Sequence, residues 1–110
     1  MNQIQVNIVN ALMEEIHHDN VGKGFWDEDR NEGEAIMLMV TELAEGFEDC
    51  RKGKEKSDKI PAFSPMEEEL ADCIIRILDW CGGKDYRVAE AMQAKLEYNK
   101  TRAYKHGKKF

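Results

Sequence analysis

This sequence of 110 residues lacks the features that mark a disulfide framework, a zinc site or a membrane protein. Its three cysteines are an odd number without a C-x-x-C pair, and free thiols in a reducing compartment account for them. No run reaches membrane-spanning length, and the N-terminus has no apolar signal-peptide core. We therefore expect a cytoplasmic protein with no membrane partner.

Proline is also scarce, with two residues, and the glycines gather at breaks between periodic segments. Hydrophobic residues make up 42% of the chain, which is enough for a folded core. Strand signals are absent, so we expect an all-α protein. The length leaves no room for a second core, so residues 1–110 should form a single domain.

Positive charge is confined largely to one end. The formal net charge is −6, yet residues 95–110 carry six Lys or Arg against one Glu. A nucleic-acid groove needs an extended positive surface, so we expect no nucleic-acid polymer as a partner. An acidic body with a basic C-terminal segment suits a small anion bound together with metal ions.

Apolar residues at helical spacing predict four helices, over residues 3 to about 18, 31 to 52, 65 to 81 and 85 to 103. The third has the clearest start, with Ser64 as N-cap, Pro65 at the first helical position and Glu67 completing a capping box. Gly82-Gly83 is expected to end it. Short connections predict an antiparallel four-helix bundle, or hairpins that complete their core by association into a homodimer or homotetramer.

Each predicted helix has an apolar stripe that we expect to face the core. In the second helix the stripe is Ile36, Met39, Val40, Leu43, Phe47 and Cys50. In the third it is Leu70, Ile74, Ile77, Leu78 and Cys81, and in the fourth Val88, Met92 and Leu96.

Two acidic motifs dominate the middle of the chain: Glu42-Leu43-Ala44-Glu45 and Glu69-Leu70-Ala71-Asp72. Each places two carboxylates three residues apart, on one face of a helix. Two helices can converge four such groups around a hard cation, and oxygen ligands favour Mg²⁺, Mn²⁺ or Ca²⁺. The alternative is a pair of solvated acidic faces, with Asp72 paired to Arg76 one turn later.

The stretches GFWDEDRNEGEAIMLMVTELAEGFEDCRKG, EEELADCIIRILDW and KLEYNKTRAYKHGKKF resemble the MazG-like all-α nucleoside triphosphate pyrophosphohydrolases. The family pattern is E-x-x-E, a spacer, then E-x-x-D; here the spacer is the 23 residues from Gly46 to Glu68. The resemblance spans about residues 17 to 109.

The resemblance implies a four-helix bundle and hydrolysis of a (deoxy)nucleoside triphosphate to the monophosphate and pyrophosphate. It implies Mg²⁺, with Mn²⁺ as a substitute, held by Glu42, Glu45, Glu69 and Asp72. Glu45, or otherwise Glu42, would be the base that activates the attacking water. Resembling proteins form dimers or tetramers.

Nucleotide contacts are expected from two further segments. Lys95, Asn99 and Arg102 follow at i, i+4 and i+7, close to one helical face, where they can grip phosphates. A basic helix end favoured by the helix dipole is the alternative. Lys23 and the aromatic pair Phe25 and Trp26 lie before the second helix, and Asn31 lies at its start. The aromatic rings there either stack on a base or plug the end of the bundle.

Two other functions remain open at this point. A non-catalytic helical adaptor would use its acidic faces to bind a divalent ion or a basic partner. A phosphoribosyl-ATP pyrophosphohydrolase is a narrower alternative. Gly46, directly after Glu45, either permits close helix approach or allows local adjustment near a metal ion.

Overall fold

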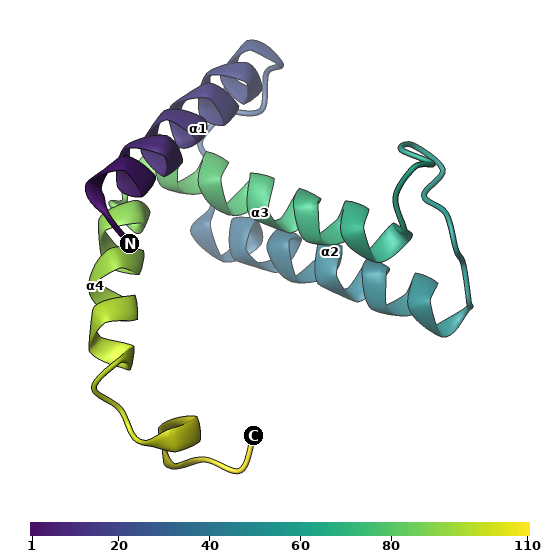
Figure 1. The fold of residues 1–110 in the computed structure, drawn as a ribbon. Coiled ribbons are helices and arrows are strands. Elements are labelled where there is room, and N and C mark those ends of the chain that lie inside the picture. Colours follow the sequence, from purple (N-terminus) through teal and green to yellow (C-terminus); the bar gives the residue numbers. More distant parts are fainter.

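A computed structural model describes residues 1–110 and is helical throughout, with no β-strand (Figure 1). The elements are α1 (Gln3–Gly22), α2 (Glu32–Arg51), α3 (Pro65–Lys84), α4 (Val88–Asn99) and a short 3₁₀ helix, η1 (Tyr104–Gly107). The predicted all-α class is confirmed. No helix qualifies as a transmembrane segment.

Side-chain caps fix the starts of the three long helices. The Ser64 hydroxyl accepts the Glu67 backbone N–H and the Glu67 side chain accepts that of Ser64, so the predicted capping box is confirmed. Asn31 caps α2 by accepting the Glu34 backbone N–H at 3.0 Å. Asn2 and Gln5 form a further capping box at α1, which we did not predict.

The helix ends differ more from the prediction. α3 continues through Gly82 and Gly83 and ends at Lys84, followed by Asp85 as the C-cap in a left-handed conformation with φ 57°. These glycines serve packing, because a Cβ at Gly83 would overlap the Trp26 ring and one at Gly82 would lie 2.9 Å from the His17 Cβ. α1 extends to Gly22, and α4 ends at Asn99, four residues before the predicted end.

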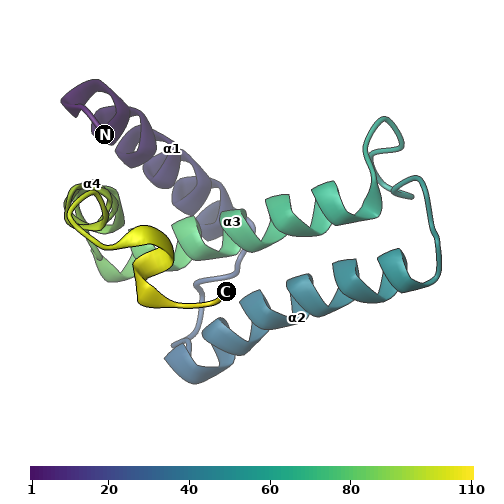
Figure 2. The same ribbon diagram turned by 60° about the horizontal axis from the view of Figure 1, so that its bottom comes forward.

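α2 and α3 form an antiparallel hairpin (Figures 1 and 2). α1 crosses the C-terminal half of α3. α4 packs on α1, where the Asn10 amide donates to a Glu90 carboxylate oxygen at 2.8 Å. α4 has no substantial packing against the hairpin. The radius of gyration is 16.4 Å, against about 13 Å for a compact domain of this length. The chain alone therefore does not close a four-helix bundle.

The prediction of which faces are buried was wrong for much of the chain. On α2 the face against α3 consists of Ala35, Glu42 and Gly46, while Phe47 of the predicted stripe is 62% exposed. Small residues let α2 approach α3 closely, and the neighbouring apolar stripe, about 100° around the helix, is left pointing outward. The exposed members of the predicted stripes are Ile36, Val40, Leu43, Phe47, Cys50, Leu70, Ile74, Met92 and Leu96.

The buried hydrophobic core is small. Trp80 and Val6 are its largest fully buried side chains, and Ala89 of α4 is completely buried. Only 13 of the 110 residues are buried, and three of them are the carboxylate residues Glu42, Glu69 and Asp79 of the α2–α3 hairpin.

Candidate metal centre

Three of the four predicted carboxylates meet between α2 and α3. Glu42 from α2 and Glu69 and Asp72 from α3 each offer an oxygen, and these oxygens all lie within 4.8 Å of one another. The fourth, Glu45, is outside this group and is exposed, but it lines the same cavity. We call Glu42, Glu69 and Asp72 the carboxylate cluster.

Gly46 allows the two helices to come this close. A Cβ at this position would lie 3.0 Å from the Met66 sulfur and 3.1 Å from the Glu69 Cβ. The close-approach interpretation is therefore correct. The glycine costs roughly 1 kcal/mol of helix propensity, and it brings the cluster together.

Glu42 is neutralised from the opposite helix. The Arg76 Nε donates to Glu42 Oε1 at 2.6 Å. Burial raises the pKa of Glu42, but the hydrogen bonds from Glu69 and Arg76 outweigh it and leave that pKa below its usual value. The predicted alternative, an ion pair between Arg76 and Asp72 within one helix, is replaced by this bond between helices.

Glu69 is the most perturbed group of the cluster. Burial and the neighbouring Glu42 carboxylate raise the pKa of Glu69 to about 8. Burial and the charge of Glu42 likewise raise the pKa of Asp72. Glu69 is only 8% exposed, and its Oε2 is buried without any hydrogen-bond partner.

These properties fit a hard divalent cation. The donors are all carboxylate oxygens, which suit Mg²⁺, Mn²⁺ or Ca²⁺. The unpartnered Glu69 oxygen leaves an unmet demand for positive charge, because a buried polar atom without a partner is costly. A divalent ion would supply this positive charge and replace the proton that the raised pKa keeps on Glu69.

The cluster lines a cavity of about 440 Å³ that also contains three basic side chains: Arg30, Lys59 and Arg76. Our sequence reasoning assigned none of them to the site. The position of Arg76 was readable, since it follows Asp72 by four residues on the same helix face. Lys59 comes from the connector before α3, where no periodicity signals its position.

Asp79, which also lines this cavity, is the centre of a hydrogen-bonded network. The Asp79 carboxylate, 3% exposed, accepts from Trp26 Nε1 at 2.9 Å and from Arg30 at 3.2 Å. It also contacts His17 Nδ1 at 2.9 Å. Trp26 stacks on Trp80 with ring centroids 5.4 Å apart. Of the two predictions for Trp26, the structure shows the packing role.

The remaining predicted nucleotide-binding residues lie elsewhere. Lys23 is exposed in the turn after α1, and Asn31 is the N-cap of α2. Lys95, Asn99 and Arg102 do not line the cavity, and their common helical face is lost because α4 ends at Asn99. Instead, Lys95 lies over the Tyr98 ring at 4.8 Å.

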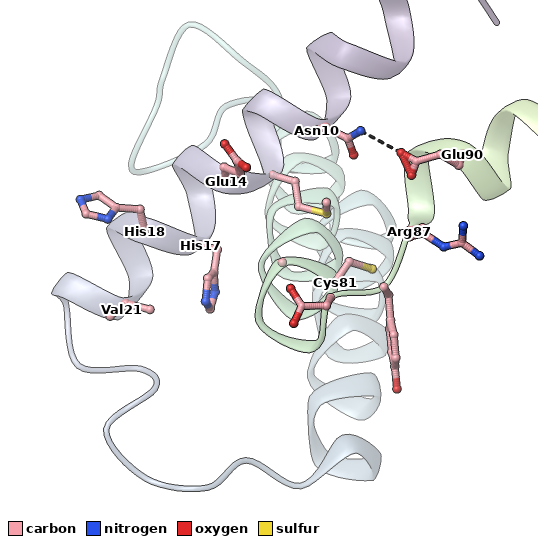
Figure 3. A pocket seen from close by; sticks show the side chains of 12 residues that line it. Asn10, Glu14, His17, His18, Val21, Cys81, Arg87 and Glu90 are labelled. Atoms are coloured by element: carbon pink, nitrogen blue, oxygen red, sulfur yellow. Dashed lines mark hydrogen bonds between the residues drawn. The ribbon is translucent and has the colours of Figure 1, made fainter. Parts of the chain in front are cut away.

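A second cavity, of about 620 Å³, lies where α1 meets the junction of α3 and α4 (Figure 3). His17, His18 and Glu14 line one side, and Arg87 and Glu90 the other. It lacks a convergent group of carboxylates, so the smaller, acidic cavity is the candidate site.

Comparison with known proteins adds no assignment. No protein-family model matches the sequence. Neither the curated proteins nor the solved structures include a significant match.

Proposed function

We propose that this protein is a Mg²⁺-dependent nucleoside triphosphate pyrophosphohydrolase of the MazG-like type. The observation that carries the proposal is the convergence of Glu42, Glu69 and Asp72 around an unpartnered buried oxygen. The E-x-x-E and E-x-x-D pattern that resembles this family supplies these same residues. The product pair would be a nucleoside monophosphate and pyrophosphate.

The carboxylate cluster would hold the ion. When bound, the ion would supply Lewis-acid chemistry: it would neutralise the charge that develops on the phosphates and lower the pKa of the attacking water. Glu45, one turn after Glu42 and exposed on the cavity rim, is in this proposal the base that takes the proton from the attacking water. Glu42 is less suited to that role because its carboxylate belongs to the cluster that would hold the ion.

The phosphates would enter a cavity that already contains positive charge. Lys59 lines the cavity, is exposed and has no salt bridge to the cluster, which leaves its ammonium available to a phosphate oxygen. Phe25 lines the same cavity and is 59% exposed, so it offers a face on which a base can stack. Of the aromatic pair Phe25 and Trp26, Phe25 would therefore take the stacking role.

Self-association is part of the proposal. The outward apolar faces of α2 and α3 are too large to leave in water without cost. A second copy of the chain covering them would form a homodimer or homotetramer. It would also give the basic segment 95–110 a route to the carboxylates of a neighbouring copy.

The test is product analysis with a panel of canonical and modified triphosphates in the presence of Mg²⁺. We expect pyrophosphate release that is lost in Asp72→Asn and in Glu45→Gln, with helical content retained. Glu34→Gln is the matched control, since Glu34 is an exposed carboxylate on α2 that does not line the cavity. Orthophosphate as sole product, or full turnover in both site variants, would refute the proposal.

Metal binding without any nucleotide turnover would instead support the adaptor. Turnover of phosphoribosyl-ATP alone would identify the narrower enzyme.

A further inference from the structure

Arg76 is the one basic side chain of the cavity that is bonded to the carboxylate cluster. Its Nε lies 2.6 Å from Glu42 Oε1. Arg30 is bonded to Asp79 instead, and Lys59 forms no salt bridge and acts on Glu42 only through its charge. Arg76 therefore supplies the positive charge that Glu42 requires while the cluster holds no ion.

A guanidinium and a divalent ion compete for this position. Glu42 belongs to the cluster whose oxygens lie within 4.8 Å of one another, so an ion held there would lie beside the Arg76 guanidinium. Like charges at such a separation in a partly buried site repel one another strongly. Glu42 therefore binds either the Arg76 guanidinium or the divalent ion strongly, but not both at once.

The Arg76 side chain has a second position available within the cavity. Its side chain is 37% exposed and lines the cavity into which the triphosphate would enter. Once free of Glu42, its guanidinium offers a planar set of donors that matches phosphate oxygens. The α3 backbone does not need to move, because the long side chain can reorient by rotamer changes alone.

We propose that Arg76 is an exchangeable counter-ion: it neutralises Glu42 in the ion-free protein and transfers to the triphosphate when Glu42 turns to the metal ion. This inference rests on the proposed function. It has a signature that a structural arginine lacks. Removing Arg76 should strengthen metal binding in the absence of nucleotide and weaken triphosphate binding in the presence of metal.

The first measurement is titration calorimetry of Mn²⁺ into the nucleotide-free protein. In the wild type, Mn²⁺ must displace the charged hydrogen bond from Arg76 to Glu42, and Arg76→Gln lacks this bond. Arg76→Gln should therefore bind Mn²⁺ on the order of tenfold more tightly than the wild type. The second uses a non-hydrolysable α,β-imido triphosphate at saturating Mn²⁺. There Arg76→Gln should bind about tenfold more weakly, since one charge-assisted phosphate contact is absent.

Lys59→Gln is the matched control for loss of charge alone, since Lys59 lines the same cavity without a bond to the cluster. It should tighten Mn²⁺ binding less than Arg76→Gln does. Its effect should vanish in about 1 M salt, where exposed charges are screened, whereas that of Arg76→Gln should persist. If Arg76→Gln loses its helical content, Arg76→Lys replaces it: we expect wild-type Mn²⁺ affinity and weakened triphosphate binding.

The outcomes separate the two proposals. Suppose that the wild type binds Mn²⁺ and releases pyrophosphate. Weaker Mn²⁺ binding in Arg76→Gln, a gain no larger than that of Lys59→Gln, or unchanged triphosphate affinity then overturns the role of Arg76 alone. A wild type that binds no divalent ion overturns the proposed function itself.

Discussion

Replacing Glu69 with Gln tests the electrostatics on which the candidate site depends. The pKa of Glu69 is raised to about 8 from its usual value of 4.5, first by burial and then by Glu42. Between these two pH values the folded protein holds a proton that the unfolded chain has released. The contribution of Glu69 to stability is therefore greatest below about pH 4.5 and is lost as the pH rises through about 8.

The size of the effect follows from the interval. Between about pH 5.5 and about pH 8.5, an ion-free wild type should lose roughly 3 kcal/mol of unfolding free energy through Glu69. Glu69→Gln keeps the shape of the protonated side chain and cannot ionise. We expect its stability to change little over this range, and at about pH 8.5 it should exceed that of the wild type.

The assay is urea unfolding followed by circular dichroism, at both pH values and with a chelator present. Glu34→Gln, an exposed carboxylate on α2, should retain the wild-type loss. Adding Mg²⁺ should then restabilise the wild type at the higher pH more than Glu69→Gln, because only the wild type has a Glu69 carboxylate that can hold the ion. Equal pH dependence in the wild type and Glu69→Gln would show that the buried proton lies elsewhere, and would refute the reasoning.

Three other substitutions test the fold. Gly83→Ala places a methyl group against the Trp26 ring, so urea unfolding should show a loss of about 1–3 kcal/mol; Gly22→Ala, with open space around it, is the control and should be neutral or slightly stabilising. Ser64→Ala removes the α3 cap and should cost about 1 kcal/mol in the same assay; an unchanged midpoint would contradict the capping role. Phe47→Glu should convert the proposed oligomer to a monomer in sedimentation, and a wild type that is itself monomeric would contradict the proposed association.

The parts of this structure that could be predicted are those that depend on local rules. The capping box at Ser64 and Glu67 depends on residues three apart, and the structure confirms it. The shared face of Glu69 and Asp72 follows from the same helical geometry, and both residues reach the cluster. Glu42 joins them from α2 because Gly46 lets the helices approach closely, which the sequence suggested without deciding.

Tertiary packing decided what could not be predicted. Gly82 and Gly83 read as a helix end by their backbone freedom, yet they lie inside α3 because Trp26 and His17 occupy the space where side chains would be. Arg30 reaches the cavity from the connector after α1 and binds Asp79 on α3, and no sequence spacing relates the two.

The wrong prediction of the buried faces has a physical cause. Hydrophobic periodicity identifies the apolar face of a helix, but it does not tell which surface covers that face. On α2 the small residues Ala35 and Gly46 face α3, so the large residues Ile36 and Phe47 point outward. Residues 95–110 carry the charge that suits a phosphate, yet they do not reach the cavity of their own chain. A second copy of the chain packed on the outward face of α2 would bury these large apolar residues. Its cavity would also lie within reach of the basic segment 95–110 of the first copy. Phe47→Glu should therefore lose both the oligomer, measured by sedimentation, and nucleotide turnover. A monomeric Phe47→Glu that keeps full turnover would show that activity does not depend on association.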